Sequence, residues 1–435
     1  MRITLIAFGS RGDVQPHIAL GAGLQTAGHS VRVVTHTLFE PLIRSLGLEF
    51  SPVEINPRDV VDDKAGQDWL GSGANFLQFF QHFSRIAEPL IQQAMRDCWH
   101  ASQGSDMLVF SPLAIGVASS IAEKLGVPYW IGAGQPLTPT RACAIPFFPQ
   151  APGWLPCGRG LYHRSTYHWS AQLYWRLLLQ PMNKARREVL DLQPLSPNWL
   201  YEQLRKQAIP MLYYFSPTVL PRPVDWNERN QLTGYWYLED PLGALPNGRP
   251  SAELVKFLAT GQPSIYVGFG SMHSRRSMQM TKIVLTTLEK TRQRAVLATG
   301  WGGIGEAICD RDLPENIFVL DYVPHDWLFP QLSAVVHHGG AGTMAAAVRA
   351  GIPAVIIPFF GDQPFWGQRF YELGVTPAPI PQKRLTVERL ARAIQLATND
   401  ETIHTRMQAL SEHIREEHGV RRAIEIITAV PPTLS

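Results

Sequence analysis

The stretch His337 to Thr343, HHGGAGT, constrains the fold of this chain more than any other feature. It follows the apolar run from Leu332 to Val336 and precedes a run compatible with a helix, Met344 to Ala350. This order predicts a strand, a glycine-rich turn and the start of a helix. The first backbone N–H groups of a helix have no partner within it, and glycines let a ligand approach them closely. We therefore expect the turn to bind phosphate.

A second polar feature, the adjacent pair Asp362 and Gln363, lies nineteen positions after Thr343. Another apolar run, Ala354 to Ile357, stands between the two features. A carboxylate next to a carboxamide offers acceptors and a donor of hydrogen bonds, which suits the hydroxyl groups of a sugar. A site for a diphosphate beside a site for a sugar indicates a nucleotide sugar as ligand.

The segment from Tyr322 to Gly367 resembles the donor-binding signature of glycosyltransferase family 1, above all that of its sterol 3-beta-glucosyltransferase branch. The resemblance rests on YVPHDWLFPQLSAVVHHGGAGT and PFFGDQPFWG. The amino-terminal GSRGDVQP, residues 9–16, is similar to the opening loop of the same branch. The two motifs anchor the two halves of the chain, so the resemblance covers nearly all of it. It implies the GT-B fold, an α/β fold in which two Rossmann-like domains face each other across a cleft.

The order of apolar runs and helix-compatible segments also predicts a doubly wound parallel sheet in each half. The expected strands are Ile3–Phe8, Val31–Val34, Met107–Phe110, Pro128–Ile131 and Met211–Phe215, then Ser264–Val267, Ala295–Ala298, Ile317–Leu320, Ala334–His337 and Ala354–Ile357. We place an acceptor-binding domain at 1–240, a linker at 241–252 and a donor-binding domain at 253–410. The resemblance implies that a final helix, in 411–435, returns to the first domain.

An aromatic insertion, at about 138–200, interrupts the first domain. Its aromatic residues include Phe147, Phe148, Trp154, Tyr167, Trp169 and Trp175. They could line an apolar cleft for a flat, lipophilic alcohol. The alternative is that most of them pack the insertion onto its own domain. The helix expected at 162–179 mixes basic and apolar residues, which also permits contact with a membrane surface.

The resemblance implies roles for individual residues on the donor side. The residues at the phosphate-binding positions of the family are His338, Gly340, Gly342, Thr343 and, in a second loop, Ser271. The residues expected near the uracil base are Trp301, Tyr322, Val323 and His325. Those expected to face the donor from the amino-terminal loop are Ser10, Arg11 and Gly12. The sugar hydroxyls are expected at Asp362 and Gln363; for Tyr322, a plain core aromatic is the alternative.

Asp13 is the candidate general base. Plant relatives place a histidine in this loop, whereas the sterol branch has an aspartate, as this chain does. A carboxylate with a pKa of about 3.9 is a weak base toward an alcohol, so it must act late in proton transfer or have its pKa raised by dehydration. The alternative is that Asp13 caps a helix starting near Pro16. The neighbouring histidines, His17 and His36, are better explained as structural residues.

Composition limits the partners of the protein. A net charge of +3 over 435 residues, without blocks of like charge, argues against nucleic acid. The four cysteines show no CxxC spacing, which argues against a zinc site or disulfides and favours a reducing cytoplasm. No apolar run is long enough for a membrane span. We expect a cytoplasmic monomer, with the option of a peripheral membrane contact, and no cofactor or metal; Asp310-Arg311-Asp312 matches a metal-binding DxD string only superficially.

With these features, the resemblance implies inverting, metal-independent transfer of glucose from UDP-glucose to a hydroxyl of a lipophilic acceptor, above all a sterol. Inversion follows because a single carboxylate base without an enzyme nucleophile implies direct displacement. Carotenoids, hopanoids, flavonoids and macrolides are alternative acceptors. A UDP-sugar 2-epimerase and a non-catalytic UDP-sugar-binding protein remain as alternatives of another class. A nicotinamide-dependent enzyme is disfavoured, since no GxGxxG follows the first strand.

Overall fold

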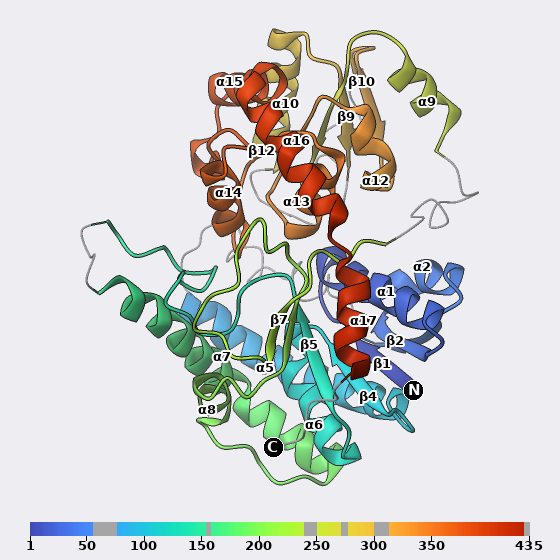
Figure 1. The fold of residues 1–435 in the computed structure, drawn as a ribbon, viewed down its shortest axis with the longest axis vertical. Helices are drawn as coiled ribbons and strands as arrows, with labels where there is room; N and C mark the ends of the chain where they lie inside the picture. The colour runs from blue at the N-terminus through green and yellow to red at the C-terminus, as the bar shows by residue number, and fades with distance from the viewer. Residues whose placement is uncertain (55–75, 154–157, 239–249, 271–276, 300–312, 430–435) are drawn as a thin grey trace. The chain divides into compact units, whose positions relative to one another are not determined.

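The computed structural model describes residues 1–54, 76–153, 158–238, 250–270, 277–299 and 313–429 (Figure 1). These residues form two compact units, one holding 1–54, 76–238 and 417–429 and the other holding 250–416. Most of the linker predicted at 241–252 lies outside the described residues. Among the residues that are described, no helix is long and apolar enough to cross a membrane.

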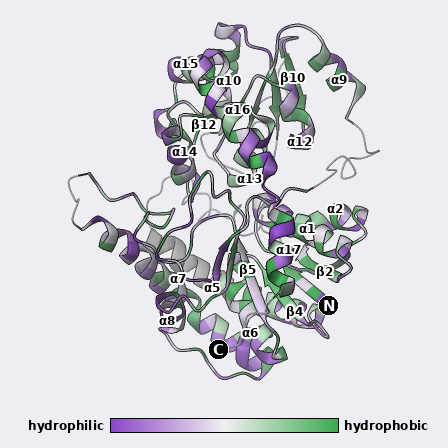
Figure 2. Cartoon of the chain, viewed as in Figure 1, coloured by the Kyte–Doolittle hydropathy of each residue, from purple (hydrophilic) through white to green (hydrophobic). Residues whose placement is uncertain are grey.

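The first unit is built on a parallel sheet of seven strands in the order β3-β2-β1-β4-β5-β6-β7. Its strands are β1 (Arg2–Ile6), β2 (Ser30–His36), β3 (Glu49–Val53), β4 (Met107–Phe110), β5 (Tyr129–Ala133), β6 (Met211–Tyr213) and β7 (Asn230–Leu232). All four side chains of β4 are buried, because the central strands of such a sheet are covered on both faces. Figure 2 shows the same apolar character along β1 and β4.

Helices complete the first unit. They are α1 (Arg11–Thr26), α2 (Glu40–Ser45), α5 (Phe76–Ala101), α6 (Ile115–Leu125), α7 (Arg159–Leu190), α8 (Trp199–Arg205) and α17 (Gly419–Ala429), with one-turn helices η1 (Thr37–Phe39) and η2 (Pro112–Ala114). The last helix packs on the first: a Cβ placed on Gly23 of α1 would collide with Val420 of α17. The carboxy-terminal helix therefore belongs to the amino-terminal unit.

The second unit holds a parallel sheet of five strands in the order β10-β9-β8-β11-β12. Its strands are β8 (Ile265–Gly268), β9 (Ala295–Ala298), β10 (Ile317–Leu320), β11 (Ala334–His337) and β12 (Ala354–Ile356). Its helices are α9 (Ala252–Ala259), α10 (Ser277–Thr291), α12 (His325–Leu328), α13 (Ala341–Ala350), α14 (Gln363–Glu372), α15 (Val387–Asn399) and α16 (Glu401–Glu416), with one-turn helices η5 (Phe329–Gln331) and η6 (Gln382–Arg384). Apolar residues of β8, β11, α10 and α15 form its core.

The predicted strands are confirmed, with small changes at their ends. Four of them, β4, β9, β10 and β11, have the predicted bounds. Two strands were missed, β3 and β7. The first contains Pro52 and the second is the polar sequence Asn230-Gln231-Leu232, so neither has the apolar pattern that identifies a strand. Pairing with a neighbouring strand, rather than side-chain pattern, makes them strands.

The first helix begins earlier than predicted. Helix α1 starts at Arg11, with Ser10 as N-cap residue, and Pro16 lies inside it. The proposed start near Pro16 is therefore wrong. Proline favours the first turn of a helix, which suggested that boundary. The turn is instead closed by Ser10 and Asp13, whose backbone and side-chain groups bond to each other.

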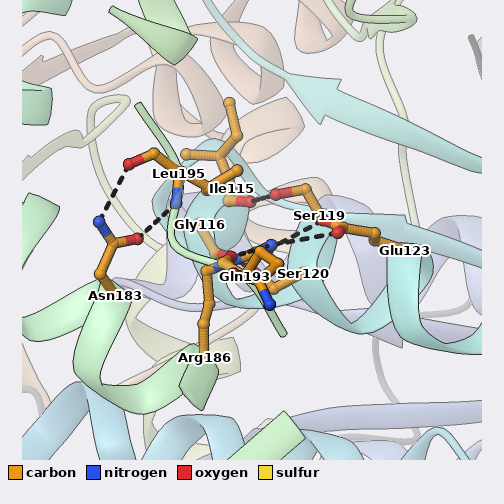
Figure 3. A network of polar contacts seen from close by, with 9 residues as sticks. All are labelled: Ile115, Gly116, Ser119, Ser120, Glu123, Asn183, Arg186, Gln193 and Leu195. Atoms are coloured by element: carbon orange, nitrogen blue, oxygen red, sulfur yellow. Dashed lines mark hydrogen bonds and ion pairs between the residues drawn. The ribbon is translucent and has the colours of Figure 1, made fainter. Parts of the chain in front are cut away.

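A buried arginine connects the long helix of the insertion, α7, to helix α6 of the same unit (Figure 3). Arg186 of α7 is 2% exposed and donates hydrogen bonds to Ser120 Oγ at 2.8 Å and to Glu123 Oε2 at 2.9 Å, both on α6. It also donates to the backbone oxygen of Gln193, beyond the end of α7. One side chain therefore joins α6, α7 and the segment that follows α7.

The aromatic residues of the insertion divide into two groups. Tyr167 and Trp175 are buried, and Trp175 donates its indole N–H to the Ser196 carbonyl at 3.0 Å. Phe147 and Trp169 are exposed, and Trp154 lies outside the described residues. The interpretation that these aromatics pack the insertion onto its own domain therefore holds for the first group only.

Candidate functional site

The carboxyl ends of three strands in the second unit meet at one edge of its sheet. His337 of β11 is paired in register with Gly268 of β8 and with Ile356 of β12. The loops that follow these strands therefore leave the sheet side by side. The strand order reverses between β8 and β11, because β9 and β10 lie on the other side of β8. In open α/β sheets such a reversal is where ligands bind.

The turn after β11 leads directly into helix α13. Gly339 has φ +91°, a left-handed conformation that glycine adopts readily, and Gly340 is the N-cap residue. The first hydrogen bond within the helix runs from Met344 N–H to the Gly340 carbonyl. The N–H groups of Ala341, Gly342 and Thr343 precede it, and no described side chain caps this helix start. The predicted anion-binding turn has the backbone geometry that it needs.

His338 lies between the turn after β11 and the loop after β8. A Cβ on Gly340 would stand 2.5 Å from its Nε2, and one on Gly270 would stand 3.2 Å from its Cε1. Its buried Nδ1 has no hydrogen-bond partner among the described residues. Burial lowers the pKa of His338 to about 4, so the imidazole is neutral at physiological pH. A neutral imidazole can donate one hydrogen bond to a ligand without a permanent charge.

The preceding residue, His337, shapes the turn rather than facing a ligand. It is fully buried, and its Nδ1 accepts a hydrogen bond from the backbone N–H of Gly339 at 3.0 Å. This bond requires the proton to be on Nε2 when the ring is neutral. Burial lowers the pKa of His337 well below its ordinary value, which keeps it neutral and able to accept. The sequence indicated that His337 and His338 are polar groups of the turn, but it did not distinguish their roles.

The Asp362–Gln363 pair lies next to the same turn. A Cβ on Gly339 would stand 3.4 Å from the backbone oxygen of Gln363. Gln363 is 5% exposed, and its Oε1 accepts the backbone N–H of Phe359 at 2.8 Å. The carboxamide is thus oriented by the backbone. The structure brings the predicted sugar-binding pair and the predicted phosphate turn together at one sheet edge.

Three residues predicted near the base occupy the segment after β10. Tyr322 is 37% exposed, so the alternative that it is a plain core aromatic is wrong. Val323 is buried. The His325 ring stacks on Phe329 with a centroid separation of 4.3 Å and meets Tyr266 edge-on. Ser271 and Trp301, the other predicted donor-side contacts, lie outside the described residues.

Asp13 lies in the first turn of α1, the helix that follows β1 in the first unit, where the strand order also reverses, between β1 and β4. Its Oδ2 accepts the backbone N–H of Ser10 at 2.9 Å and the Ser10 hydroxyl at 3.0 Å. Burial raises the pKa of Asp13, and the two hydrogen bonds from Ser10 oppose that rise. Asp13 therefore stabilises the start of α1 by accepting hydrogen bonds from the N-cap residue, Ser10. Its pKa is also raised, which is the direction that general-base catalysis needs. Gly12 and Arg11 are exposed beside it.

The two histidines near Asp13, His17 and His36, each form a hydrogen bond to the protein backbone. His17 is fully buried, bonds through Nδ1 to the Asp13 carbonyl at 2.8 Å and contacts Tyr214 and Trp236 edge-on. Burial lowers its pKa to about 4. His36 accepts the backbone N–H of Gly9 through Nε2. Their positions agree with the structural interpretation of both residues.

No group of three or more histidine, cysteine, aspartate or glutamate side chains suited to a metal ion occurs in the described parts of the chain. The residues gathered at the edge of the second sheet instead offer backbone N–H groups, an imidazole and a carboxylate–carboxamide pair. These groups are of the kinds that bind a diphosphate and the hydroxyls of a sugar.

Comparison with known proteins defines the class of fold. The glycosyltransferase VinC, solved in complex with dTDP, superposes with a TM-score of 0.68 at 17% identity and covers 99% of both chains. The glycosyltransferase SnogD from Streptomyces nogalater superposes with a TM-score of 0.65 at 19% identity, again over 99% of both chains. The chain therefore has the GT-B fold of two Rossmann-like domains, as predicted.

Family models and relatives narrow the assignment. Residues 3–143 match the glycosyltransferase family 28 N-terminal domain, and residues 306–423 match the C-terminal domain of erythromycin biosynthesis protein CIII-like proteins. Relatives named sterol 3-beta-glucosyltransferase, from Sclerotinia sclerotiorum and Debaryomyces hansenii, are 38% and 37% identical over 98% of this chain. The chain spans only 29% and 26% of the length of these two relatives. The chain thus has the GT-B fold, contains regions that match these two domain models, and is similar in sequence to the relatives named sterol 3-beta-glucosyltransferase.

Proposed function

We propose that this protein transfers glucose from UDP-glucose to a hydroxyl group of a sterol or a similar lipophilic alcohol. The observation that carries the proposal is the edge of the second sheet, where a free helix start, a neutral buried imidazole and the Asp362–Gln363 pair adjoin one another. The helix start of α13 and His338 hold the diphosphate, and the pair holds the sugar. The names of the relatives support glucose and a sterol as substrates.

The helix start also stabilises the reaction itself. Negative charge grows on the diphosphate as its bond to the anomeric carbon breaks. Backbone N–H groups and the positive end of the helix dipole favour that charge in a fixed geometry, so they stabilise the transition state more than the ground state. The neutral His338 adds a hydrogen bond to the same leaving group. The leaving group is thus stabilised by groups that this chain supplies.

Asp13 takes the proton of the acceptor hydroxyl in this proposal. Its raised pKa makes it a better base than an exposed aspartate, although it stays far weaker than an alkoxide. Proton transfer therefore completes late, as the oxygen bonds to the sugar carbon. Direct attack without an enzyme nucleophile inverts the anomeric centre, so an α-linked donor gives a β-glucoside.

A screen of nucleotide release tests the proposal. The protein is incubated with UDP-glucose, UDP-galactose, UDP-GlcNAc or dTDP-glucose, each against a sterol, a carotenoid, a hopanoid, a flavonoid and a macrolide aglycone. We expect release of UDP with UDP-glucose and sterol, and a β-glucoside by NMR. Release with another aglycone only would overturn the sterol assignment, and an isomerised UDP-sugar without acceptor would indicate an epimerase. dTDP-glucose is included because VinC was solved with dTDP.

A further inference from the structure

We propose that Trp366 is a positioning residue that orients the carboxylate of Asp362 toward the donor sugar. The inference deepens the proposed function and rests on it. Trp366 lies one helical turn after Asp362 in α14, is 1% exposed and donates its indole N–H to Asp362 Oδ2 at 3.1 Å. Neither the domain models nor the names of the relatives assign a role to this tryptophan.

The position of Asp362 makes this contact unusual. Asp362 is the N-cap residue of α14, where an aspartate normally accepts the N–H of the second or third helical residue. The second helical residue here is Pro364, which has no N–H, and the Asp362 side chain makes no cap hydrogen bond. The carboxylate is instead bonded to an indole farther along the helix. The chain thus keeps an aspartate at a helix start without using it as a cap.

The indole is held rigidly, so it can fix the carboxylate. The ring of Trp366 packs against Phe365 at a centroid distance of 5.1 Å and against Phe370 at 6.4 Å. On the adjacent residue, Gln363, the Oε1 atom is fixed by the backbone N–H of Phe359. Contacts within the second unit therefore orient both members of the pair: the Trp366 indole bonds to Asp362 Oδ2, and the backbone N–H of Phe359 bonds to Gln363 Oε1.

Trp366→Phe removes the indole N–H and retains an aromatic ring in the buried site. We expect the Kd of UDP-glucose to rise about tenfold, as for the loss of a hydrogen bond to a charged group, while the Kd of UDP stays within about twofold. The expected result is therefore a rise in the ratio of the Kd of UDP-glucose to the Kd of UDP. KM for UDP-glucose should rise more than kcat falls, because the diphosphate and the base are unaffected.

Trp175→Phe is the matched control. Trp175 is also 1% exposed and also donates its indole N–H, to the Ser196 carbonyl, but it belongs to the first unit. The Trp175→Phe variant should have a lower melting temperature than the wild type, as Trp366→Phe should. It should leave the ratio of the Kd of UDP-glucose to the Kd of UDP unchanged. An equal change of that ratio in both variants would reduce the role of Trp366 to general stability and overturn the inference.

A double-mutant cycle with Asp362→Asn tests whether Trp366 acts through Asp362. Adding Trp366→Phe to Asp362→Asn should change UDP-glucose affinity by less than about twofold; a further tenfold loss would overturn the inference. If Trp366→Phe does not fold, a crystal structure of the wild type with UDP-glucose decides. It should retain the Trp366–Asp362 bond with the other carboxylate oxygen on a sugar hydroxyl, and an Asp362 turned from the sugar would overturn the inference. A wild type that binds UDP but not UDP-glucose would instead contradict the proposed function.

Discussion

His338 and Gly340 are in van der Waals contact across the turn that precedes α13, so a Cβ on Gly340 would stand 2.5 Å from Nε2 of the imidazole. The histidine fits only because residue 340 has no side chain. The backbone of the turn and the imidazole therefore form one surface, although only the helix start is visible as a sequence motif.

Gly340→Ala should displace His338 and weaken UDP binding. The added methyl group occupies space that the imidazole uses, so we expect the Kd of UDP to rise about tenfold by calorimetry, the effect of one lost hydrogen bond to a charged group. Gly153→Ala is the control, because a Cβ there meets nothing within 4 Å. An unchanged Kd in Gly340→Ala would contradict the close fit.

His338→Ala should weaken UDP binding by a similar factor without changing how the Kd depends on pH between about 6 and 8. Burial holds the pKa of the unliganded His338 at about 4, so the ring is neutral across this range. Wild-type and variant Kd profiles measured against pH should therefore run parallel. A wild-type affinity that falls tenfold as pH rises through 6 to 7, and does not fall in the variant, would show a charged His338 instead.

Asp13→Asn should lower kcat about 10²-fold or more and leave the Kd of UDP unchanged, because the amide cannot accept a proton. Asp106→Asn is the matched control: the Asp106 carboxylate also accepts a backbone N–H, from Arg2 at 2.7 Å, and lies at the other end of the same sheet. Turnover of Asp13→Asn within tenfold of the wild type would exclude Asp13 as the base.

Asp13 should also make the protein less stable as pH rises. Its pKa is raised by folding, so between the unfolded and the folded pKa the native state binds more protons than the unfolded state, and the free energy of unfolding falls. This contribution is complete below the unfolded pKa and is lost as pH passes the folded pKa. Asp13→Asn should therefore flatten this part of the profile of melting temperature against pH.

Ser10→Ala should move the acid limb of the pH–rate profile to higher pH. The Ser10 hydroxyl donates to Asp13 Oδ2 at 3.0 Å and lowers the pKa of that carboxyl against the effect of burial. Without the hydroxyl, the pKa of Asp13 rises further, and the base becomes protonated at a higher pH. The measurement is kcat/KM against pH for wild type and variant. A shift to lower pH would contradict this account of the Asp13 environment.

Arg186→Ala should destabilise the first unit by about 2–4 kcal/mol, since it removes several buried hydrogen bonds and leaves a cavity. Denaturant unfolding measures the loss. Arg187→Ala is the control, because the neighbouring side chain is exposed. UDP affinity should be unchanged in both variants, as the predicted phosphate turn lies in the second unit. An Arg186→Ala protein as stable as the wild type would show that the network in Figure 3 contributes little.

The regular parts of the fold could be predicted because they depend on short-range patterns. Apolar runs such as Ala334–His337 identify buried parallel strands, and glycines before a helix identify the phosphate turn. The strands β3 and β7 could not be predicted, because Pro52 and Asn230 give no strand pattern and only pairing with a neighbour defines them. The predicted start of α1 near Pro16 was wrong: proline is common in the first turn of helices, but Pro16 lies inside α1, which begins at Arg11.

The sequence by itself determined which chemical groups the chain carries and in which order: a glycine turn before a helix, an Asp–Gln pair, and an aspartate in the first loop. Only the tertiary structure decided how they are oriented. The register of β8, β11 and β12 sets the turn beside the pair, and burial makes His338 neutral. The Trp366 indole donates to the Asp362 carboxylate at the start of α14, where no side-chain cap hydrogen bond is made. The strand register and the burial arise from residues far apart in the chain, so no local pattern contains them.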